Sequence, residues 1–423
     1  MGNRIQIFRA LRYTNFRWFW INGAAQAMAQ GMQFLVLGLL VLDITGSSYQ
    51  LGLVVFAYGA PNLVFAMFGG VIADRADRLK LLISTRLAVS VLVLALAILK
   101  ISGQLEMWHI YAVVFLLGTV QALNMPARMA FVADLVEQRD MMNAISLHTM
   151  VNQTGQMIGP AMAGGLIELF GIGAALLVNA GLYLAGIIFL LLIRGLPLRA
   201  PAPKTTILRD LKEGLHCIRS TPVLYTVIGI AMAFALFGMS HRQVLPAFTE
   251  AVLDVGAGGT GLLLLGAGLG SLIGSLILAS MGDFRHKTWL LMGSVLLLSV
   301  VLTAFAWSPW YLASLAVYFF VGAMSFGLFW PVATTLIQLN VPPELRGRVL
   351  SFLQFAPAVH YLGALPLAVA ADAINWSAAI TGGAALSMVV ALWLGVWRPP
   401  LRRLEAQTDR SDAQSPTEIG TAG

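Results

Sequence analysis

The sequence predicts an all-α membrane protein with about twelve transmembrane helices. Of its 423 residues, 58% are apolar and only 11% are charged, whereas soluble domains are roughly 45–50% apolar and about 25% charged. So few charged side chains cannot cover the surface of a soluble protein of this length. Glycine is abundant, at 42 residues, which transmembrane helices tolerate. The single cysteine, Cys217, excludes a disulfide framework and a cysteine-based metal site.

Long stretches without Asp, Glu, Lys or Arg predict the individual spans, because about 20 apolar residues cross the hydrocarbon layer. One stretch, 288–343, is long enough for two helices, and we divide it at Ser308-Pro309. Residues 81–101 form a further span that contains only Arg86 and Lys100 as charged groups. The other stretches are 18–42, 44–73, 107–127, 141–167, 169–193, 220–241, 255–282, 349–371 and 373–397.

The distribution of cations predicts a multi-pass protein of the bacterial inner membrane with both termini in the cytoplasm. When the N-terminus is placed inside, 23 of the 26 Lys and Arg residues fall on inner segments, as the positive-inside rule requires. These cations are spread over many segments, whereas a nucleic-acid site would gather them on one face. We therefore expect membrane lipid and a small-molecule substrate as partners, no nucleic acid, and a monomer.

The chain divides into two halves with similar features. Ser146 follows Pro126 by 20 residues, and Ser351 follows Pro331 by the same interval, 205 residues further along the chain. Each of the two prolines is expected to end a span. Parallel six-helix repeats are one layout of secondary transporters, whose site lies between the repeats. We expect an N-terminal half at 1–193 and a pseudo-symmetric C-terminal half at 222–397.

A polar linker, 194–221, connects the halves, and a polar tail follows them at 398–423. The linker begins with Pro197, Pro201 and Pro203, and apolar residues then recur at helical spacing from Ile207 to Ile218. This pattern predicts a short amphipathic helix on the inner membrane surface, with an ordinary soluble linker helix as the alternative. The tail is rich in Ser, Thr, Asp and Gln, which predicts disorder.

Several motifs resemble the major facilitator superfamily over roughly residues 8–397. A cytoplasmic signature between the second and third spans matches at Gly70, Asp74, Arg75 and Arg78. The segments Pro126-Ala127-Arg128 and Val341-Pro342-Pro343-Glu344-Leu345-Arg346 resemble a bacterial branch that includes the enterobactin exporter and macrolide efflux proteins. The resemblance implies that the signature loop latches the halves together on the cytoplasmic side. Asp74 is also placed to cap the third helix, and a simple cap is the alternative role.

The fifth span carries a motif similar to the antiporter signature of this family, at Gly155, Gly159, Pro160 and Gly164. The eighth span repeats small residues at Gly266, Gly270 and Gly274, a spacing that lets helix backbones approach closely. The resemblance implies that these two helices meet across the interface between the halves. The alternative is that the glycines tighten packing within each half.

A polar stripe on the first span consists of Asn22, Gln26, Gln30 and Gln33. At 100° per residue these amides share one face, and unpaired amides are costly against lipid. We expect the stripe to line a central cavity, with helix–helix hydrogen bonding as the alternative. The other cavity candidates are Asn124, Asn152, Gln156, His360 and Tyr361.

Few ionisable residues fall inside spans, where they are candidates for function. His241 and Arg242 lie late in the seventh span, and Asp43 ends the first span on the same side, so we expect an outer gate there. A headgroup anchor is the alternative for Arg242. No carboxylate lies in the middle of a span, so the carrier of the coupling ion, expected to be H⁺, is not identified. No phosphate loop or metal-ligand spacing is present, so we expect no cofactor and no metal.

These features predict a secondary active transporter and not an enzyme. We expect it to export a small amphipathic organic compound, of the drug or siderophore kind, by alternating access driven by an ion gradient. Uptake of a small nutrient by the same fold is the first alternative. A membrane enzyme or a lipid-handling protein is the second, and it would require a polar catalytic cluster at one depth, which the sequence does not contain.

Overall fold

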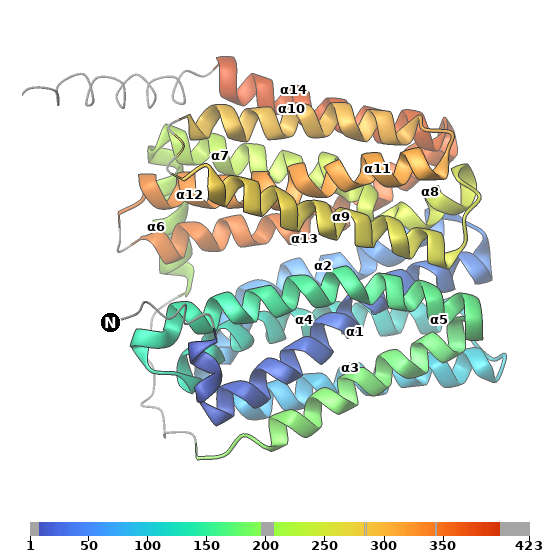
Figure 1. Cartoon of the computed structure of the whole chain (residues 1–423), viewed down its shortest axis with the longest axis horizontal. Coiled ribbons are helices and arrows are strands. Elements are labelled where there is room, and N and C mark those ends of the chain that lie inside the picture. Colours follow the sequence, from blue (N-terminus) through green and yellow to red (C-terminus); the bar gives the residue numbers. More distant parts are fainter. Residues whose placement is uncertain (1–7, 196–206, 283, 285, 343–344, 398–423) are drawn as a thin grey trace, which may run out of the picture.

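The computed structural model describes residues 8–195, 207–282, 284, 286–342 and 345–397, with side chains other than those of 66–75, 207–211, 354, 357 and 396–397. Over these residues the chain is a bundle of long helices that run along one axis (Figure 1). Ten stretches are long and apolar enough to span a membrane. The predicted all-α membrane fold is confirmed.

The N-terminal half begins with a short 3₁₀ helix, η1 (Arg9–Arg12), and a turn at Tyr13. Its long helices are α1 (Thr14–Thr45), α2 (Ser48–Arg75), α3 (Arg78–Ile101), α4 (Met107–Leu135) and α5 (Met141–Leu191), with η2 (Gln138–Asp140) before α5. Helix α5 is two crossings in one, because Gly171 has a φ of 81° and breaks it. That conformation favours glycine, which has no side chain to clash.

The C-terminal half follows α6 (Ile207–Ser220), the predicted linker helix, and is less regular. Its seventh crossing combines α7 (Pro222–Ala233), the π-helical η3 (Phe234–Gly238), η4 (Ser240–Val244) and α8 (Leu245–Val252). The tenth crossing likewise joins α11 (Tyr311–Gly322) to α12 (Trp330–Asn340) through the π-helical η5 (Ala323–Phe329). The remaining helices are α9 (Ala257–Ser280), α10 (Lys287–Ala306), α13 (Arg346–Ala373) and α14 (Trp376–Leu392), with η6 (Trp393–Trp397) at the end.

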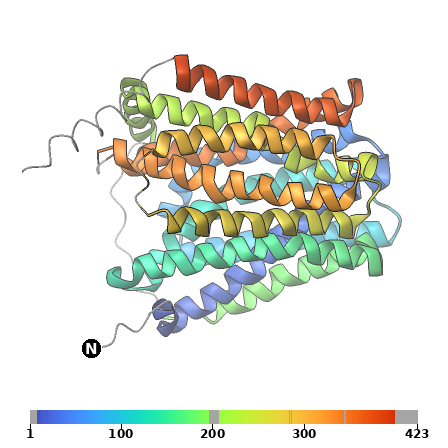
Figure 2. The same cartoon turned by 45° about the horizontal axis from the view of Figure 1, so that its top comes forward.

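The two halves lie one above the other, with η1 and α6 at the same end of the bundle (Figures 1 and 2). Two helix pairs join them: α2 packs on α13, and α5 packs on α9. A Cβ built on Gly52 would lie 2.8 Å from Cβ of Ala368, and one on Gly164 would lie 2.4 Å from the carbonyl oxygen of Ala257. Helices α5 and α9, which contain the fifth and eighth spans, therefore meet between the halves.

The apolar core is divided differently in the two halves. One cluster of buried side chains fills the C-terminal half from end to end and continues into the outer part of the N-terminal half. A second, separate cluster occupies the inner end of the N-terminal half, around Phe16, Phe19, Phe131 and Leu147. A layer of buried polar side chains lies between these clusters.

Two predictions about helix ends are wrong. Pro126 lies inside α4, and Pro331 stands in the first turn of α12, directly after η5. Proline is tolerated inside membrane helices because neighbouring groups satisfy the freed carbonyl. Asp74 does not begin the third helix, because α2 continues to Arg75; instead the Asp77 side chain caps α3 by accepting a hydrogen bond from the Lys80 amide at 3.2 Å.

Candidate functional site

The amide stripe of α1 packs inside the N-terminal half. Gln26 is 1% exposed and donates to the Asn124 side chain at 3.3 Å, while Gln30 donates to Gln121 at 3.0 Å. Gln33 accepts a hydrogen bond from the Tyr183 hydroxyl at 2.7 Å. Three of the four amides are thus paired with neighbouring helices, which removes the cost of an unsatisfied polar group, whereas Asn22 is 1% exposed and its Oδ1 has no hydrogen-bond partner. Hydrogen bonding between helices, the alternative role, is observed for these three amides, and the lining of a central cavity stays a prediction.

A layer of buried cationic and polar groups continues this network toward the inner end. Arg86 on α3 is 3% exposed, and Arg128 on α4 is 5% exposed. The Arg86 guanidinium lies 6.0 Å from the centroid of the Tyr183 ring. Next to them, His148 on α5 is buried and stacks on Phe19 at 5.2 Å. In the sequence alone, Arg86 is only a charged residue within a span, and Arg128 follows a proline that is expected to end one.

The halves meet at mid-depth through aromatic and polar residues. The rings of Tyr58 on α2 and Tyr361 on α13 lie 5.1 Å apart, so that one tyrosine from each half forms the contact. Beside Tyr361, the ring of His360 contacts the Gln243 amide of η4. The Ser240 hydroxyl donates to the His360 carbonyl oxygen at 3.0 Å. Of the two residues predicted on the eleventh span, Tyr361 thus lies at the boundary between the halves, and its neighbour His360 bonds to η4 within the C-terminal half.

Asp43 and Arg242, which are predicted to form an outer gate, do not pair with each other. Asp43 forms an ion pair with Lys100, within the N-terminal half. Arg242 instead lies over the ring of Phe326, 5.2 Å from its centroid. Its neighbour His241 is 2% exposed and donates from Nδ1 to the Gly238 carbonyl oxygen at 2.7 Å. Both residues belong to the 3₁₀ helix η4, which directly follows the π-helical η3, so a regular helix does not describe this part of the crossing.

Most of the predicted interface glycines pack within their own half. A Cβ on Gly155 would lie 2.4 Å from Cβ of Ala27, and one on Gly159 would lie 2.5 Å from the Met28 carbonyl oxygen, both on α1. In the other half, Gly266, Gly270 and Gly274 face α11 and η5. Of this predicted set, Gly164 does lie between the halves, and the carbonyl oxygen of Pro160 approaches Gly261 of α9. The spacing of small residues therefore indicates that another helix approaches closely, but it does not indicate which helix.

The latch signature is described only in part. The guanidinium of Arg78 donates to the Asp134 carboxylate at 2.7 Å and to the Ala130 carbonyl oxygen at 2.8 Å, so that it ties α3 to the end of α4. Gly70, Asp74 and Arg75 belong to α2, but their side chains lie outside the described residues. The remaining cavity candidates, Asn152 and Gln156, bond to each other at 3.3 Å on α5, and Gln156 is exposed.

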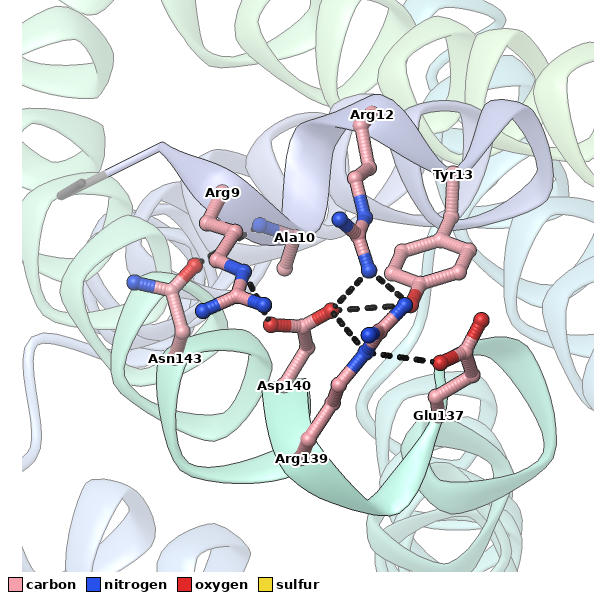
Figure 3. Close-up of polar contacts among 8 residues, drawn as sticks. All are labelled: Arg9, Ala10, Arg12, Tyr13, Glu137, Arg139, Asp140 and Asn143. Atoms are coloured by element: carbon pink, nitrogen blue, oxygen red, sulfur yellow. Dashed lines mark hydrogen bonds and ion pairs between the residues drawn. The ribbon is translucent and has the colours of Figure 1, made fainter.

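A carboxylate that sequence analysis missed organises the inner end of the N-terminal half. Asp140 in η2 is 1% exposed and binds Arg9 at 2.7 Å and Arg12 at 2.6 Å, and it accepts the Tyr13 hydroxyl at 2.8 Å (Figure 3). Burial acts to raise the pKa of Asp140, but the Tyr13 hydrogen bond and the arginine charges outweigh it, so the pKa lies below the ordinary 3.8. The amide of Ala10 also donates to Asn143 at 2.8 Å. We call this group the Asp140 clamp.

The C-terminal half has a corresponding ion pair in which the charges are exchanged: the preceding segment supplies the carboxylate and the half supplies the arginine. Glu213 on α6 forms an ion pair with Arg348 in the first turn of α13. Arg348 stands 205 residues after Asn143, which is the offset between the two halves. The same position in each half therefore binds the segment that precedes the first crossing of that half, η1 in one case and α6 in the other. Next to this pair lies a cavity of about 610 Å³, lined by Lys212, His216 and Cys217 of α6 together with Pro342 and Leu345.

The fold and these sites define a multi-pass membrane transporter of two facing six-helix halves. The sequence matches the Major Facilitator Superfamily over residues 19–359 and 244–420. The chain therefore belongs to that family. Within the described residues, no group of three or more His, Cys, Asp or Glu residues is placed to hold a metal ion.

Several exporters are similar to this chain. Macrolide efflux protein A of Streptococcus pyogenes is 22% identical over 342 residues, which cover 79% of this chain and 84% of that protein. The multidrug efflux pump Tap of Mycolicibacterium fortuitum is 25% identical and covers 86% and 91%. The enterobactin exporter EntS of Escherichia coli O1:K1 / APEC is 26% identical and covers 72% and 73%.

Solved structures share the fold at low identity. A bacterial homologue of the human lysosomal transporter Spinster, in an inward-facing and unoccupied conformation, has a TM-score of 0.70 at 16% identity. The match covers 96% of this chain and 99% of that one. The POT family transporter PepTSo has a TM-score of 0.73 at 12% identity, and the match covers 94% of this chain and 99% of that one.

Proposed function

We propose that this protein exports small amphipathic organic compounds from the bacterial cytoplasm by alternating access. The observation that carries the proposal is where the halves touch. The described contacts gather in the outer part and the middle of the bundle, from Gly38 beside Pro246 to Tyr58 beside Tyr361. Contacts there close the outer side of the bundle, which suits the stage of the cycle at which an exporter collects its substrate.

Three further points belong to the same proposal. Both termini lie in the cytoplasm, because that orientation puts most cations inside. Transport is driven by an ion gradient, with H⁺ as the coupling ion, and the chain works as a monomer. The efflux proteins among the relatives support the outward direction.

The test is an efflux measurement with a matched variant. Cells that lack their main drug pumps are loaded with ethidium or erythromycin, and accumulation is compared with and without this protein. We expect lower accumulation with the protein, and loss of the difference when the proton gradient is collapsed. Asp74→Asn, in the latch signature, should abolish most of the difference at normal membrane abundance. Higher accumulation with the protein would indicate uptake and would overturn the proposal.

A further inference from the structure

The buried basic layer of the N-terminal half has properties that packing alone does not explain. Arg86 lies eight residues after the start of α3, and Arg128 lies seven residues before the end of α4. Both are therefore about 10–12 Å from the inner ends of their helices. His148 lies seven residues into α5, and Asn22 lies eight residues into α1. Four helices thus place polar groups at one depth.

Both guanidinium groups lack the partners that a buried cation requires. Nε and Nη2 of Arg86, and Nε and Nη1 of Arg128, are buried and make no hydrogen bond. Among the described residues, no carboxylate pairs with either arginine. The two cations also act on each other and on the neighbouring His148. Buried like charges without a counter-ion are strongly unfavourable, so an anion bound between them would be strongly stabilised.

The donor set indicates what kind of anion fits. A guanidinium presents a planar fork of N–H donors that matches the two oxygens of a carboxylate. Aromatic rings stand beside these donors: Tyr183 next to Arg86, and Phe19 stacked on His148. This combination suits an acidic group carried on an apolar or aromatic body. An inorganic anion would use the forks but not the rings.

We propose that the Arg86–Arg128 layer binds the carboxylate of a small organic acid and that the substrates of this transporter are such anions. The two amide pairs, Gln26–Asn124 and Gln30–Gln121, tie α1 to α4 on the outer side of the layer. These pairs close the layer toward the outer side of the membrane. The substrate assignment rests on the proposed export function, whereas the binding site does not.

Binding is tested on the whole protein in lipid nanodiscs, with the melting temperature followed by tryptophan fluorescence. The probes are benzoate, its uncharged counterpart benzamide, sodium chloride and inorganic phosphate, at constant ionic strength. We expect benzoate at ten times its Kd or more to raise the Tm by about 2 °C, and benzamide to have no effect. Arg86→Gln and Arg128→Gln should each lose the benzoate shift, whereas Arg219→Gln, at an exposed position on α6, should keep it.

Two measurements separate a binding role from a structural one. Arg128→Met removes an unpaired charge, so without added anion its Tm should equal or exceed that of the unchanged protein, and a large fall would overturn the proposal. Arg86→Lys keeps the charge but loses the fork, so benzoate should bind at least about fivefold more weakly. A benzoate shift that survives in both Gln variants, or no shift with any probe, would also overturn it. A shift with chloride or phosphate but not benzoate would indicate an inorganic anion site.

The binding result and the export result can fail separately. If benzoate binds through the arginines but cells show no efflux, the export function is wrong and the site remains. If efflux is normal in Arg86→Gln and Arg128→Gln, the site has no part in transport and the substrate assignment is wrong.

Discussion

The two halves differ in their interiors at one depth. The N-terminal half has Arg128 and His148 there, whereas the counterpart positions of the C-terminal half, 205 residues later, are Ala333 and Leu353. The ninth residue of α3 is Arg86, and the ninth residue of α10 is the fully buried Val295. The polar layer separates two apolar clusters in the first half, and one unbroken cluster fills the second. At this depth the interior of the first half is polar and that of the second half is apolar, and we call them the wet half and the dry half for this difference alone.

This difference assigns different tasks to the halves. A dry, closely packed interior is rigid and cannot accept a polar ligand without losing contacts. A polar interior can exchange one set of hydrogen bonds for another. We infer that the N-terminal half carries chemical recognition, while the C-terminal half supplies a firm surface against which the first half moves. Each prediction below tests one side of this contrast.

The largest effect is expected when the charge of the first half is copied into the second. Ala333→Arg places a guanidinium at a position that is 0% exposed and belongs to the apolar cluster of that half. Without polar partners the buried charge should cost about 3 kcal/mol or more. We expect a several-fold loss of membrane-integrated protein, measured by fluorescence-detected size exclusion. Ala333→Leu, which adds bulk without charge, is the control and should be milder; equal yields for Arg and unchanged protein would show that the second half is not dry.

The next effect concerns how closely the dry half is packed. A Cβ on Gly270 would lie 1.9 Å from the carbonyl oxygen of Phe319. Gly270→Ala should therefore push α9 from α11 and lower stability by about 1–3 kcal/mol, seen as a lower Tm. Gly293→Ala on α10 is the matched control, because its Cβ would meet no atom within 4 Å. If both variants melt at the same temperature, the close packing of the second half is refuted.

The fold follows from the sequence to a greater degree than the site does. Charge-free stretches predict the crossings because each must be long and apolar, and most helices begin and end within about five residues of them. The exceptions are the C-terminal ends of α4, at Leu135 and not 127, and of the seventh crossing, at Val252 and not 241. The partner of a glycine does not follow in this way, because the same spacing serves packing within a half and between halves, as Gly270 demonstrates. Arg128 would lie in a loop if Pro126 ended its helix. Because α4 continues to Leu135, Arg128 lies within the helix and is buried in the N-terminal half.

A smaller effect is expected in the wet half. Gln26→Leu and Asn124→Leu each break the amide pair between these residues and leave the other amide without this partner. Asn124→Leu also loses the hydrogen bond that Asn124 Nδ2 donates to the Thr85 hydroxyl at 2.7 Å. Each should cost about 1 kcal/mol, in line with other hydrogen bonds between membrane helices. The double variant should lose less than the sum of the two, because no orphaned amide remains. The measurement is a double-mutant cycle on Tm or on unfolding free energy, and strictly additive losses would mean that the two amides do not depend on each other.

The smallest effect compares the two segments that precede each half. Asp140→Asn removes the charge that holds Arg9 and Arg12, so hydrogen exchange of residues 8–13 should increase while Tm falls little. Glu213→Gln is the counterpart on α6, and its pair with Arg348 has both side chains about one third exposed. Ion pairs that are partly exposed to solvent contribute little to stability. Hydrogen exchange in α6 should therefore change less than hydrogen exchange in η1. A larger change in α6 would reverse the ranking.

The Asp140 clamp also has a defined response to pH. Because the folded pKa of Asp140 is lowered, its contribution to stability is complete above the ordinary carboxyl value of 3.8 and is lost as pH falls through the lower, folded value. Exchange of residues 8–13 should therefore change little with protonation between about pH 5 and 8 once the intrinsic rate is corrected, and should rise only in stronger acid. Asp140→Asn should already show the raised, corrected exchange at neutral pH and gain no further acid dependence. Release of η1 near neutral pH in the unchanged protein would mean that a group other than Asp140 holds it, because a carboxylate with a lowered pKa keeps its charge throughout that range.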